Sequence, residues 1–254
     1  MRLALYSDLH LELAPWEPPS IDVDVVILAG DIASHTHGIE WAAKAFPNVS
    51  DVLYVAGNHE YYDAHLGLLD ELQKPFWEQL GVQFLERRSI EIAGVRFLGC
   101  TLWSGFDLYG KDNAEWCMNA AKRSINDYWM ISAHKGKRLE PSDTLKLHRT
   151  AVRWLDSELA KPFNGKTVVV THFAPHPRCV APQYQGNDVT AYFVTDLSGL
   201  MEKHRIDLWC YGHTHTNCDF VAENGCRVVS NQLGYSGERT RPDMGFRRDL
   251  IITL

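Results

Sequence analysis

The sequence lacks any apolar run long enough to span a membrane, and Arg2 leads directly into a strand-like segment rather than a secretory leader. Its six cysteines show no C-x-x-C spacing. Positive charge is also scarce, because 25 Lys and Arg stand against 32 Asp and Glu, for a net charge of −7. We therefore expect a cytoplasmic protein with reduced core thiols, no membrane contact and no stable binding of nucleic acid.

Length and composition indicate a folded chain with a large core. Of 254 residues, 45% are hydrophobic and 22% are charged. This composition is ordinary for a globular protein and argues against a disordered chain or a fibre. No internal repeat, low-complexity tract or linker interrupts the sequence. We expect a single domain over residues 1–254.

Five short apolar runs are each followed by polar residues, a pattern typical of buried strands. The runs are Leu3 to Tyr6, Val25 to Leu28, Val52 to Val55, Val168 to Val170 and Asp207 to Cys210. The polar residues that follow them are Asp8 and His10, then Asp31, then Asn58, His59 and Glu60, then His172, and finally His213 and His215. Because ligand sites in open α/β sheets form at the carboxyl ends of strands, we expect these side chains to gather at one edge.

Helix-like and hairpin-like segments complete the pattern. The segments with helical spacing are 39–46, 64–80 with a distortion at Pro75, and 142–164. Tight turns at 93–94 and at Asn224-Gly225 indicate two β-hairpins. Strands that alternate with helices favour parallel pairing. The predicted fold class is α/β, with two mixed β-sheets packed as a sandwich and flanked by helices.

The spacing of the polar residues favours two metal ions over one. Asp8-x-His10 and His213-x-His215 each leave one residue between ligands, so both side chains of a pair can reach one ion. The two carboxylate oxygens of Asp31 can bridge two ions. Imidazole with carboxylate or amide oxygen, and no cysteine, suits Mn, Fe or Zn and argues against a structural zinc site. Two divalent ions roughly 3.5–4 Å apart would stabilise an in-line displacement at phosphorus.

In chain order these residues form five motifs. They are Asp8-x-His10, Gly30-Asp31, Gly57-Asn58-His59-Glu60, Thr171-His172 and Gly212-His213-x-His215. Together they resemble the full motif set of the calcineurin-like metallophosphoesterases, over residues 8 to 215. The resemblance implies an αββα sandwich and the hydrolysis of phosphate esters at a dinuclear metal centre. It is specific because all five motifs occur in the family's order, each behind an apolar run.

The same resemblance implies a role for each residue. One metal would be held by Asp8, His10, Asp31 and His215, and the other by Asp31, Asn58, His172 and His213. His59 would donate a proton to the leaving group, and its neighbour Glu60 is a candidate to orient it. The nucleophile would be a hydroxide between the two metals, because coordination lowers the pKa of water towards roughly 7.

Departures from the family pattern narrow the substrate. Members that dephosphorylate protein serine and threonine carry Gly-Asp-x-Val-Asp-Arg-Gly, whereas this chain reads Gly30-Asp31-Ile32-Ala33-Ser34-His35. The pattern resembles the phosphodiesterase branch more closely, so a small phosphodiester is the predicted substrate, with a nucleotide as one option. The alternatives are a phosphomonoesterase or nucleotidase, then a nuclease for short single strands. A metal-binding scaffold without catalysis is disfavoured, because competent residues occupy all eight positions.

Substrate contacts are expected from an insert around residues 103–141 and from the loop Asn231 to Arg248. Both segments carry aromatic and basic side chains, among them Tyr128, Tyr235 and Arg241. Tyr128 and Tyr235 would stack on a base or line a pocket; the alternative for each is packing beneath a loop. His35 and His37 are expected in an exposed loop, and His134, His148 and His204 on the surface or on a helix face. For His176, a place in the site and a place outside it both stay open.

Overall fold

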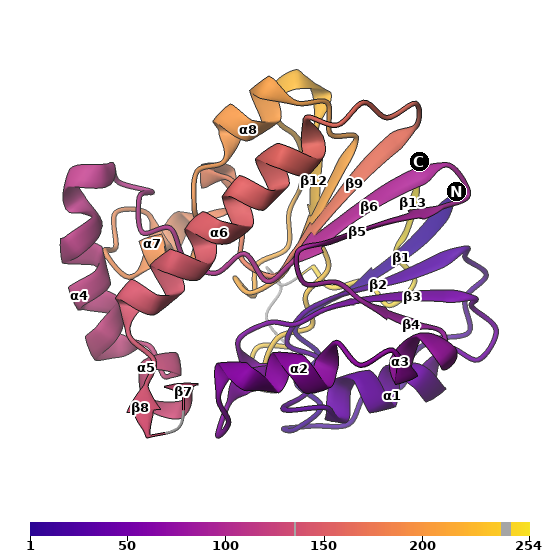
Figure 1. Ribbon diagram of the computed structural model, residues 1–254, viewed down its shortest axis with the longest axis horizontal. Coiled ribbons are helices and arrows are strands. Elements are labelled where there is room, and N and C mark those ends of the chain that lie inside the picture. Colours follow the sequence, from indigo (N-terminus) through magenta and orange to yellow (C-terminus); the bar gives the residue numbers. More distant parts are fainter. Residues whose placement is uncertain (135, 240–244) are drawn as a thin grey trace.

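Two β-sheets lie face to face in the computed structural model, with helices on their outer faces (Figure 1). The structure describes residues 1–134, 136–239 and 245–254. Arg241 therefore lies outside the described residues, as does part of the loop Asn231 to Arg248. The α/β sandwich predicted from the sequence is confirmed.

The first sheet has the strand order β13-β1-β2-β3-β4. Its strands are β1 (Arg2–Tyr6), β2 (Val25–Ala29), β3 (Asp51–Val55), β4 (Val82–Phe84) and β13 (Ile251–Thr253). Strands β1 to β4 run parallel, and β13 pairs antiparallel with β1. All residues of β2 are buried, as expected for a central parallel strand that is covered on both faces.

The second sheet has the strand order β11-β12-β10-β9-β6-β5. Its strands are β5 (Arg88–Ile92), β6 (Val95–Cys100), β9 (Lys166–Thr171), β10 (Leu208–Tyr211), β11 (Asp219–Val221) and β12 (Arg227–Ser230). The inner strands β6, β9, β10 and β12 run parallel. The edge strands β5 and β11 are antiparallel to their neighbours.

Both predicted hairpins are present at the edges of the second sheet. Ala93 and Gly94, with φ of 46° and 76°, join β5 to β6 in the left-handed backbone that a two-residue turn requires. Asn224 and Gly225 are also left-handed. They belong to a longer connection than predicted, because the pairing of β11 with β12 begins only at Val221 and Arg227.

Helices cover the outer faces of both sheets. They are α1 (His37–Ala45), α2 (Leu69–Leu72), α3 (Phe76–Gln79), α4 (Ala114–Ser124), α5 (Asp127–Met130), α6 (Pro141–Leu159), α7 (Thr190–Phe193) and α8 (Ser198–Lys203). A short hairpin of β7 (Ser132–His134) and β8 (Lys137–Arg138) lies beside α5 (Figure 1). In Figure 1, α1 to α3 lie outside the first sheet, and α6 and α8 lie outside the second.

Two helix predictions need correction. The single helix expected over 64–80 is divided into the one-turn helices α2 and α3, because Pro75 disfavours helical backbone in the residue before it. Helix α6 ends at Leu159, before the predicted 164. Its N-terminus is closed by a capping box between Glu140 and Asp143.

Two of the histidines expected on the surface or on a helix face are buried. His148 on the inner face of α6 is 6% exposed, and its Nδ1 lies 3.2 Å from the carbonyl oxygen of Trp103. His204 is 9% exposed, with Nε2 2.6 Å from a carboxylate oxygen of Asp156. The helical spacing of residues 142–164 does not show which side of that helix is covered by the segment that precedes it. His134 is exposed, as predicted.

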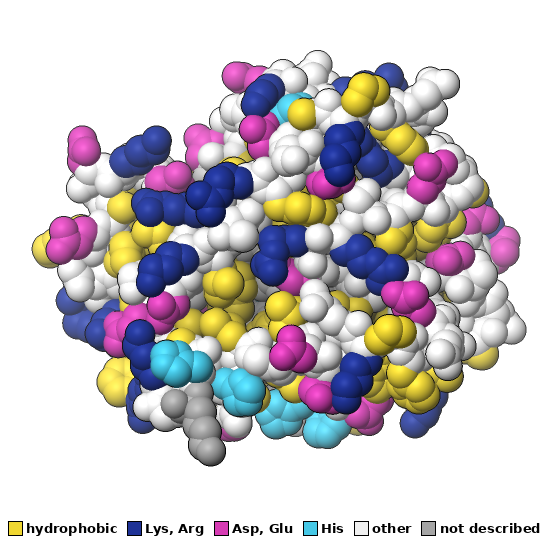
Figure 2. Space-filling view, viewed as in Figure 1, with side chains coloured by type: hydrophobic (Ala, Val, Ile, Leu, Met, Phe, Trp, Pro, Cys, Tyr) yellow, Lys and Arg dark blue, Asp and Glu magenta, His cyan; other side chains and the backbone are white. Residues whose placement is uncertain are grey.

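The face that carries α6 has mixed charge. Figure 2 shows basic and acidic side chains interspersed over it. At the surface of the second layer of helices, Lys161 pairs with Glu158 and Lys203 with Asp156. Within residues 1–134, 136–239 and 245–254, none of the helices combines the length and the apolar character that a membrane crossing needs.

The interior between the sheets is apolar. It includes Leu5, Ile27, Phe97, Val168 and Leu208, each fully buried. The carboxyl ends of the parallel strands of both sheets meet at one edge of this core (Figure 1). The segment with α4, α5 and the β7-β8 hairpin lies beyond that edge. The fold therefore brings the five motifs together, as expected from the sequence.

Candidate metal centre

The polar residues at the strand ends share an unusual backbone conformation. Asp8, His10, Asp31, His213 and His215 have φ of 54°, 45°, 53°, 75° and 48°. Left-handed backbone is uncommon outside glycine and is concentrated at functional sites, where the surrounding structure holds it. Here it turns the chain sharply after β1, β2 and β10, so that consecutive polar side chains point into one space.

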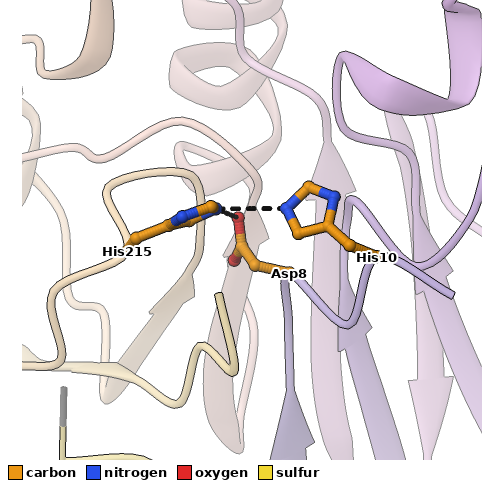
Figure 3. Close-up of side chains that lie close together, drawn as sticks. All are labelled: Asp8, His10 and His215. Atoms are coloured by element: carbon orange, nitrogen blue, oxygen red, sulfur yellow. Dashed lines mark hydrogen bonds and ion pairs between the residues drawn. The ribbon is translucent and has the colours of Figure 1, made fainter. Parts of the chain in front are cut away.

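Asp8, His10 and His215 form the first cluster, and Figure 3 shows their side chains converging. Nε2 of His215 lies 3.3 Å from Oδ1 of Asp8 and 3.1 Å from Nε2 of His10. The ring Nδ1 of His215 faces Glu238 at 2.6 Å, which favours a proton on that nitrogen. This leaves the Nε2 lone pair directed at the space between the three side chains.

Asp31, His172 and His213 form the second cluster, and Asn58 joins them. Nε2 of His172 lies 3.3 Å from Oδ2 of Asp31 and 3.1 Å from Oδ1 of Asn58. The same Oδ2 of Asp31 lies 4.0 Å from Nε2 of His10 in the first cluster. Asp31 is therefore placed between the two clusters, where its carboxylate can be shared.

The donor set fits cations. Nδ1 of His172 lies 2.9 Å from the carbonyl oxygen of Ala29, so its proton is directed there and the Nε2 lone pair faces the second cluster. Burial holds the pKa of His213 well below its usual range, so this imidazole is neutral. Its Nε2 is buried and has no hydrogen-bond partner among the described residues. An orphaned buried lone pair beside a carboxylate is what a metal ligand provides.

His59 lies beside the first cluster, with its ring centroid 4.5 Å from that of His10. Its Nδ1 is 3.2 Å from Oε1 of Glu12, its Nε2 is 3.1 Å from the hydroxyl of Tyr235, and its ring stacks on Tyr62 with centroids 4.0 Å apart. Both ring nitrogens are thus oriented. Nε2 also lies 4.0 Å from Oδ2 of Asp31. His59 therefore stands where a proton can be given to an atom bound near Asp31.

Glu12 is a site residue that the sequence reasoning missed. One oxygen, Oε1, lies 3.0 Å from Nδ1 of His10 and 3.2 Å from Nδ1 of His59. Burial opposes ionisation of Glu12, but the hydrogen bonds from His10 and His59 outweigh it and lower its pKa to about 2. The spacing Asp8-x-His10-x-Glu12, with every second residue polar, is the signal that could have revealed it.

Glu60 does not orient His59, contrary to the hypothesis drawn from the sequence. Its Oε2 accepts hydrogen bonds from the backbone N–H of Gly57 at 2.7 Å and of Asp31 at 3.1 Å. Its Oε1 accepts from the N–H of Ile32 at 3.0 Å and from the hydroxyl of Tyr54 at 2.7 Å. The fully buried carboxylate thus ties the end of β2 to the end of β3.

We expect Glu60→Ala to lower the free energy of unfolding by about 3 kcal/mol or more, because three buried N–H groups lose their acceptor. Chemical denaturation followed by circular dichroism measures the change. Glu115→Ala, at an exposed position of α4, serves as the control and should change stability by less than about 0.5 kcal/mol. Equal stability of Glu60→Ala and the wild type would contradict the structural role.

Asp127 is a second residue that the sequence did not reveal. Its Oδ1 accepts hydrogen bonds from Nδ2 of Asn58 at 2.9 Å and from the hydroxyl of Tyr62 at 3.0 Å, and its Oδ2 accepts from the hydroxyl of Tyr192. Burial raises the pKa of Asp127 in spite of these hydrogen bonds. By holding the amide nitrogen of Asn58, Asp127 directs the amide oxygen at His172.

Asp127→Asn should weaken metal binding about 10- to 100-fold, because the substituted amide offers donors as well as an acceptor to Asn58 and releases its orientation. Titration of the metal-free protein with Mn²⁺, followed by calorimetry, gives the affinity. Asp112→Asn, on the exposed surface before α4, is the matched control. An affinity that is the same in both variants would show that Asn58 does not depend on Asp127.

A cavity of about 330 Å³ opens beside the two clusters. Asp31, Asn58, His59 and Tyr235 form the wall next to the metal-ligand candidates. Tyr128 does not line the cavity, because it is 4% exposed and its hydroxyl lies 3.2 Å from Oγ1 of Thr144. Of the two tyrosines singled out from the sequence, only Tyr235 therefore faces the cavity.

The remaining histidines near these motifs lie outside the clusters. Nε2 of His35 is 2.8 Å from the carbonyl oxygen of Tyr62. His176 turns away, with Nε2 3.1 Å from a carboxylate oxygen of Glu223.

The six cysteines are free thiols, and five of them are buried, as predicted for core residues.

Comparison with known proteins agrees with this geometry. Residues 1–217 match the family model described as calcineurin-like phosphoesterase, and the chain belongs to that family. It is therefore a metal-dependent hydrolase of phosphoric esters, and its family depends on a dinuclear metal centre. The described residues offer three groups of side chains close enough to hold a metal ion: Asp8 with His10 and His215, Asp31 with His172 and His213, and His59 with His10 and Asp31.

Two similar proteins cover nearly the whole chain. An uncharacterized protein of Acanthamoeba polyphaga mimivirus is 28% identical over an alignment of 271 positions, which covers 94% of this chain and 93% of the viral protein. The crystal structure of a phosphopantetheinyl hydrolase from Mycobacterium tuberculosis aligns with a TM-score of 0.72 at 20% identity, and covers 95% of this chain and 93% of that one. The second likeness shows a shared fold.

Proposed function

We propose that this chain hydrolyses small phosphodiesters, with seven side chains as metal ligands and His59 as the proton donor. Asp8, His10 and His215 would hold one ion, Asn58, His172 and His213 would hold the other, and Asp31 would bridge them. The observation that carries the proposal is the position of Asp31 Oδ2, 3.3 Å from His172 and 4.0 Å from both His10 and His59. Mn, Fe and Zn suit this donor set.

When bound, two divalent ions would supply a water molecule of lowered pKa and neutralise charge on the phosphoryl group. The chain's own residues provide the proton for the leaving group. His59 holds its Nε2 towards the cavity, while Oε1 of Glu12 accepts a hydrogen bond from Nδ1–H and stabilises the charged ring. Donation of the Nε2 proton to the leaving oxygen prevents a high-energy alkoxide from forming.

The charge of the cavity wall supports a diester over a monoester. At neutral pH a diester carries one negative charge, and a monoester carries close to two. No Lys or Arg is among the described residues that line the cavity, so none of these side chains would balance a second charge. The family's protein phosphatases have an arginine after the bridging aspartate, and this chain has none in Gly30-Asp31-Ile32-Ala33-Ser34-His35.

The test compares two aryl esters. Protein stripped of metal is reloaded with Mn, Fe or Zn and assayed on an aryl phosphodiester and on the matching monoester. We expect kcat/KM to be about tenfold or more higher for the diester. Monoester preference would instead support a phosphomonoesterase or nucleotidase, and no turnover of any ester with any metal would favour a scaffold. Phosphopantetheinyl esters belong among the further trial substrates, because the mycobacterial hydrolase shares the fold.

We also propose that residues 1–254 act as one domain in which the segment 103–141 determines substrate choice. Ser124, Ile125, Asn126 and Asp127 of this segment line the cavity. Asp127 also holds Asn58 through the hydrogen bond described above. One segment thus contacts both the substrate space and a metal-ligand candidate.

A further inference from the structure

The cavity extends from the metal-ligand candidates to a wall with a distinct composition. The residues that line it there include the apolar Ile125, Val180 and Val189 and the amides Asn126 and Asn187. Among the described lining residues, the charged groups beyond the histidines are all acidic, namely Asp31, Asp127 and Glu238. We refer to the lining residues within 124–126 and 179–189 as the distal wall.

An anionic group at the distal wall would meet no opposite charge from the described side chains. Taking a carboxylate or phosphate out of water without a partner costs several kcal/mol. Asp127, which follows Asn126 of this wall, would add repulsion, and its oxygens already accept hydrogen bonds from Asn58, Tyr62 and Tyr192. An uncharged substrate group avoids both costs.

A neutral arm with polar amide or hydroxyl groups would also gain contacts at the distal wall. Its apolar atoms can pack on Ile125 and Val189, and its polar atoms can bond to the amides of Asn126 and Asn187. The cavity volume of about 330 Å³ lies at the lower end of the roughly 300–1,000 Å³ range of small-ligand pockets. This is room for a short chain rather than for a polymer.

We propose that this site selects phosphodiesters whose arm at the distal wall is uncharged, and that it discriminates against arms with a second anionic group. The inference rests on the phosphoesterase function proposed above and names its substrate class. It disfavours nucleotides with further phosphate groups as substrates, because the extra charge would lie where the described residues of the wall include no cation.

The experiment uses two methyl phosphodiesters that differ only at the end of a six-carbon arm, which carries an amide in one and a carboxylate in the other. Methyl is too small to occupy the distal wall, so the arm is the group that is tested. Hydrolysis by the metal-loaded protein is followed by phosphorus NMR. We expect kcat/KM to be about tenfold or more higher for the amide.

Asn126→Lys provides the matching variant, because it places a cation on the distal wall at an exposed position. It should reduce the preference for the amide about tenfold or reverse it. Asn119→Lys makes the same exchange at an exposed position of α4 that does not line the cavity, and should keep the wild-type preference.

Equal turnover of both arms by the wild type would overturn the inference while leaving the phosphoesterase function intact. The same holds if Asn126→Lys and Asn119→Lys show the same preference. Failure to hydrolyse either ester, with activity absent on the aryl diester too, would overturn the proposed function and the inference with it.

Discussion

Asp31→Ala should lose both metal ions and reduce kcat/KM on the order of a thousandfold or more. The reason is that a single carboxylate serves both clusters, with Oδ2 3.3 Å from Nε2 of His172 and 4.0 Å from Nε2 of His10. Burial opposes its ionisation, but His172 and His59 hold the pKa of Asp31 well below its usual range. Elemental analysis after dialysis gives the metal content of the variant, and an aryl diester assay gives its activity.

A second variant separates metal loss from misfolding. Oδ1 of Asp31 accepts a hydrogen bond from the backbone N–H of His59 at 2.8 Å, and Asp31→Asn keeps an acceptor there. We expect Asp31→Asn to fold, as shown by circular dichroism, and still to retain less than one ion per chain. Asp112→Ala is the exposed control. Two ions per chain in Asp31→Asn would show that this carboxylate does not bridge.

His59→Ala should keep its metal content and slow turnover about 10²- to 10⁴-fold for substrates with poor leaving groups. A leaving group with a low pKa departs without a proton, so the loss should shrink as the leaving group improves. A series of aryl and alkyl diesters, ordered by the pKa of the released alcohol, measures this dependence. The variant should show a steeper dependence than the wild type.

The control for this variant is His134→Ala, which removes an exposed histidine of β7. With saturating metal, Glu12→Gln should show a dependence of rate on leaving-group pKa that is intermediate between the wild type and His59→Ala. The reason is that the substitution weakens the hydrogen bond between Nδ1 of His59 and Oε1 of Glu12, which lie 3.2 Å apart. If His59→Ala slows good and poor leaving groups equally, the proton-donor role is wrong.

Much of the site follows from the strand pattern. The run Val25 to Leu28 is uniformly apolar and mostly β-branched, and it forms the fully buried β2 with Asp31 just beyond its end. Because parallel strands end at one edge, residues as far apart as His10 and His215 were expected to meet, and their Nε2 atoms lie 3.1 Å apart. The hydrophobic period thus determines which side chains converge.

The orienting residues did not follow from the sequence, because they depend on how loops fold back. Asp127 and Tyr128 are neighbours on α5, and successive helical residues point about 100° apart. That rotation directs Asp127 to Asn58 and Tyr128 to Thr144. The aromatic character of Tyr128 suggested a substrate contact, whereas the path of the chain places Asp127 at the site instead. The role of Glu60 was misjudged for the same reason.

The most direct test is a crystal structure of the protein soaked in Mn²⁺, with anomalous diffraction measured at the manganese edge. The account predicts two peaks on either side of Asp31, one reached by Asp8, His10 and His215 and the other by Asn58, His172 and His213. A single peak, or peaks that do not share the Asp31 carboxylate, would contradict it.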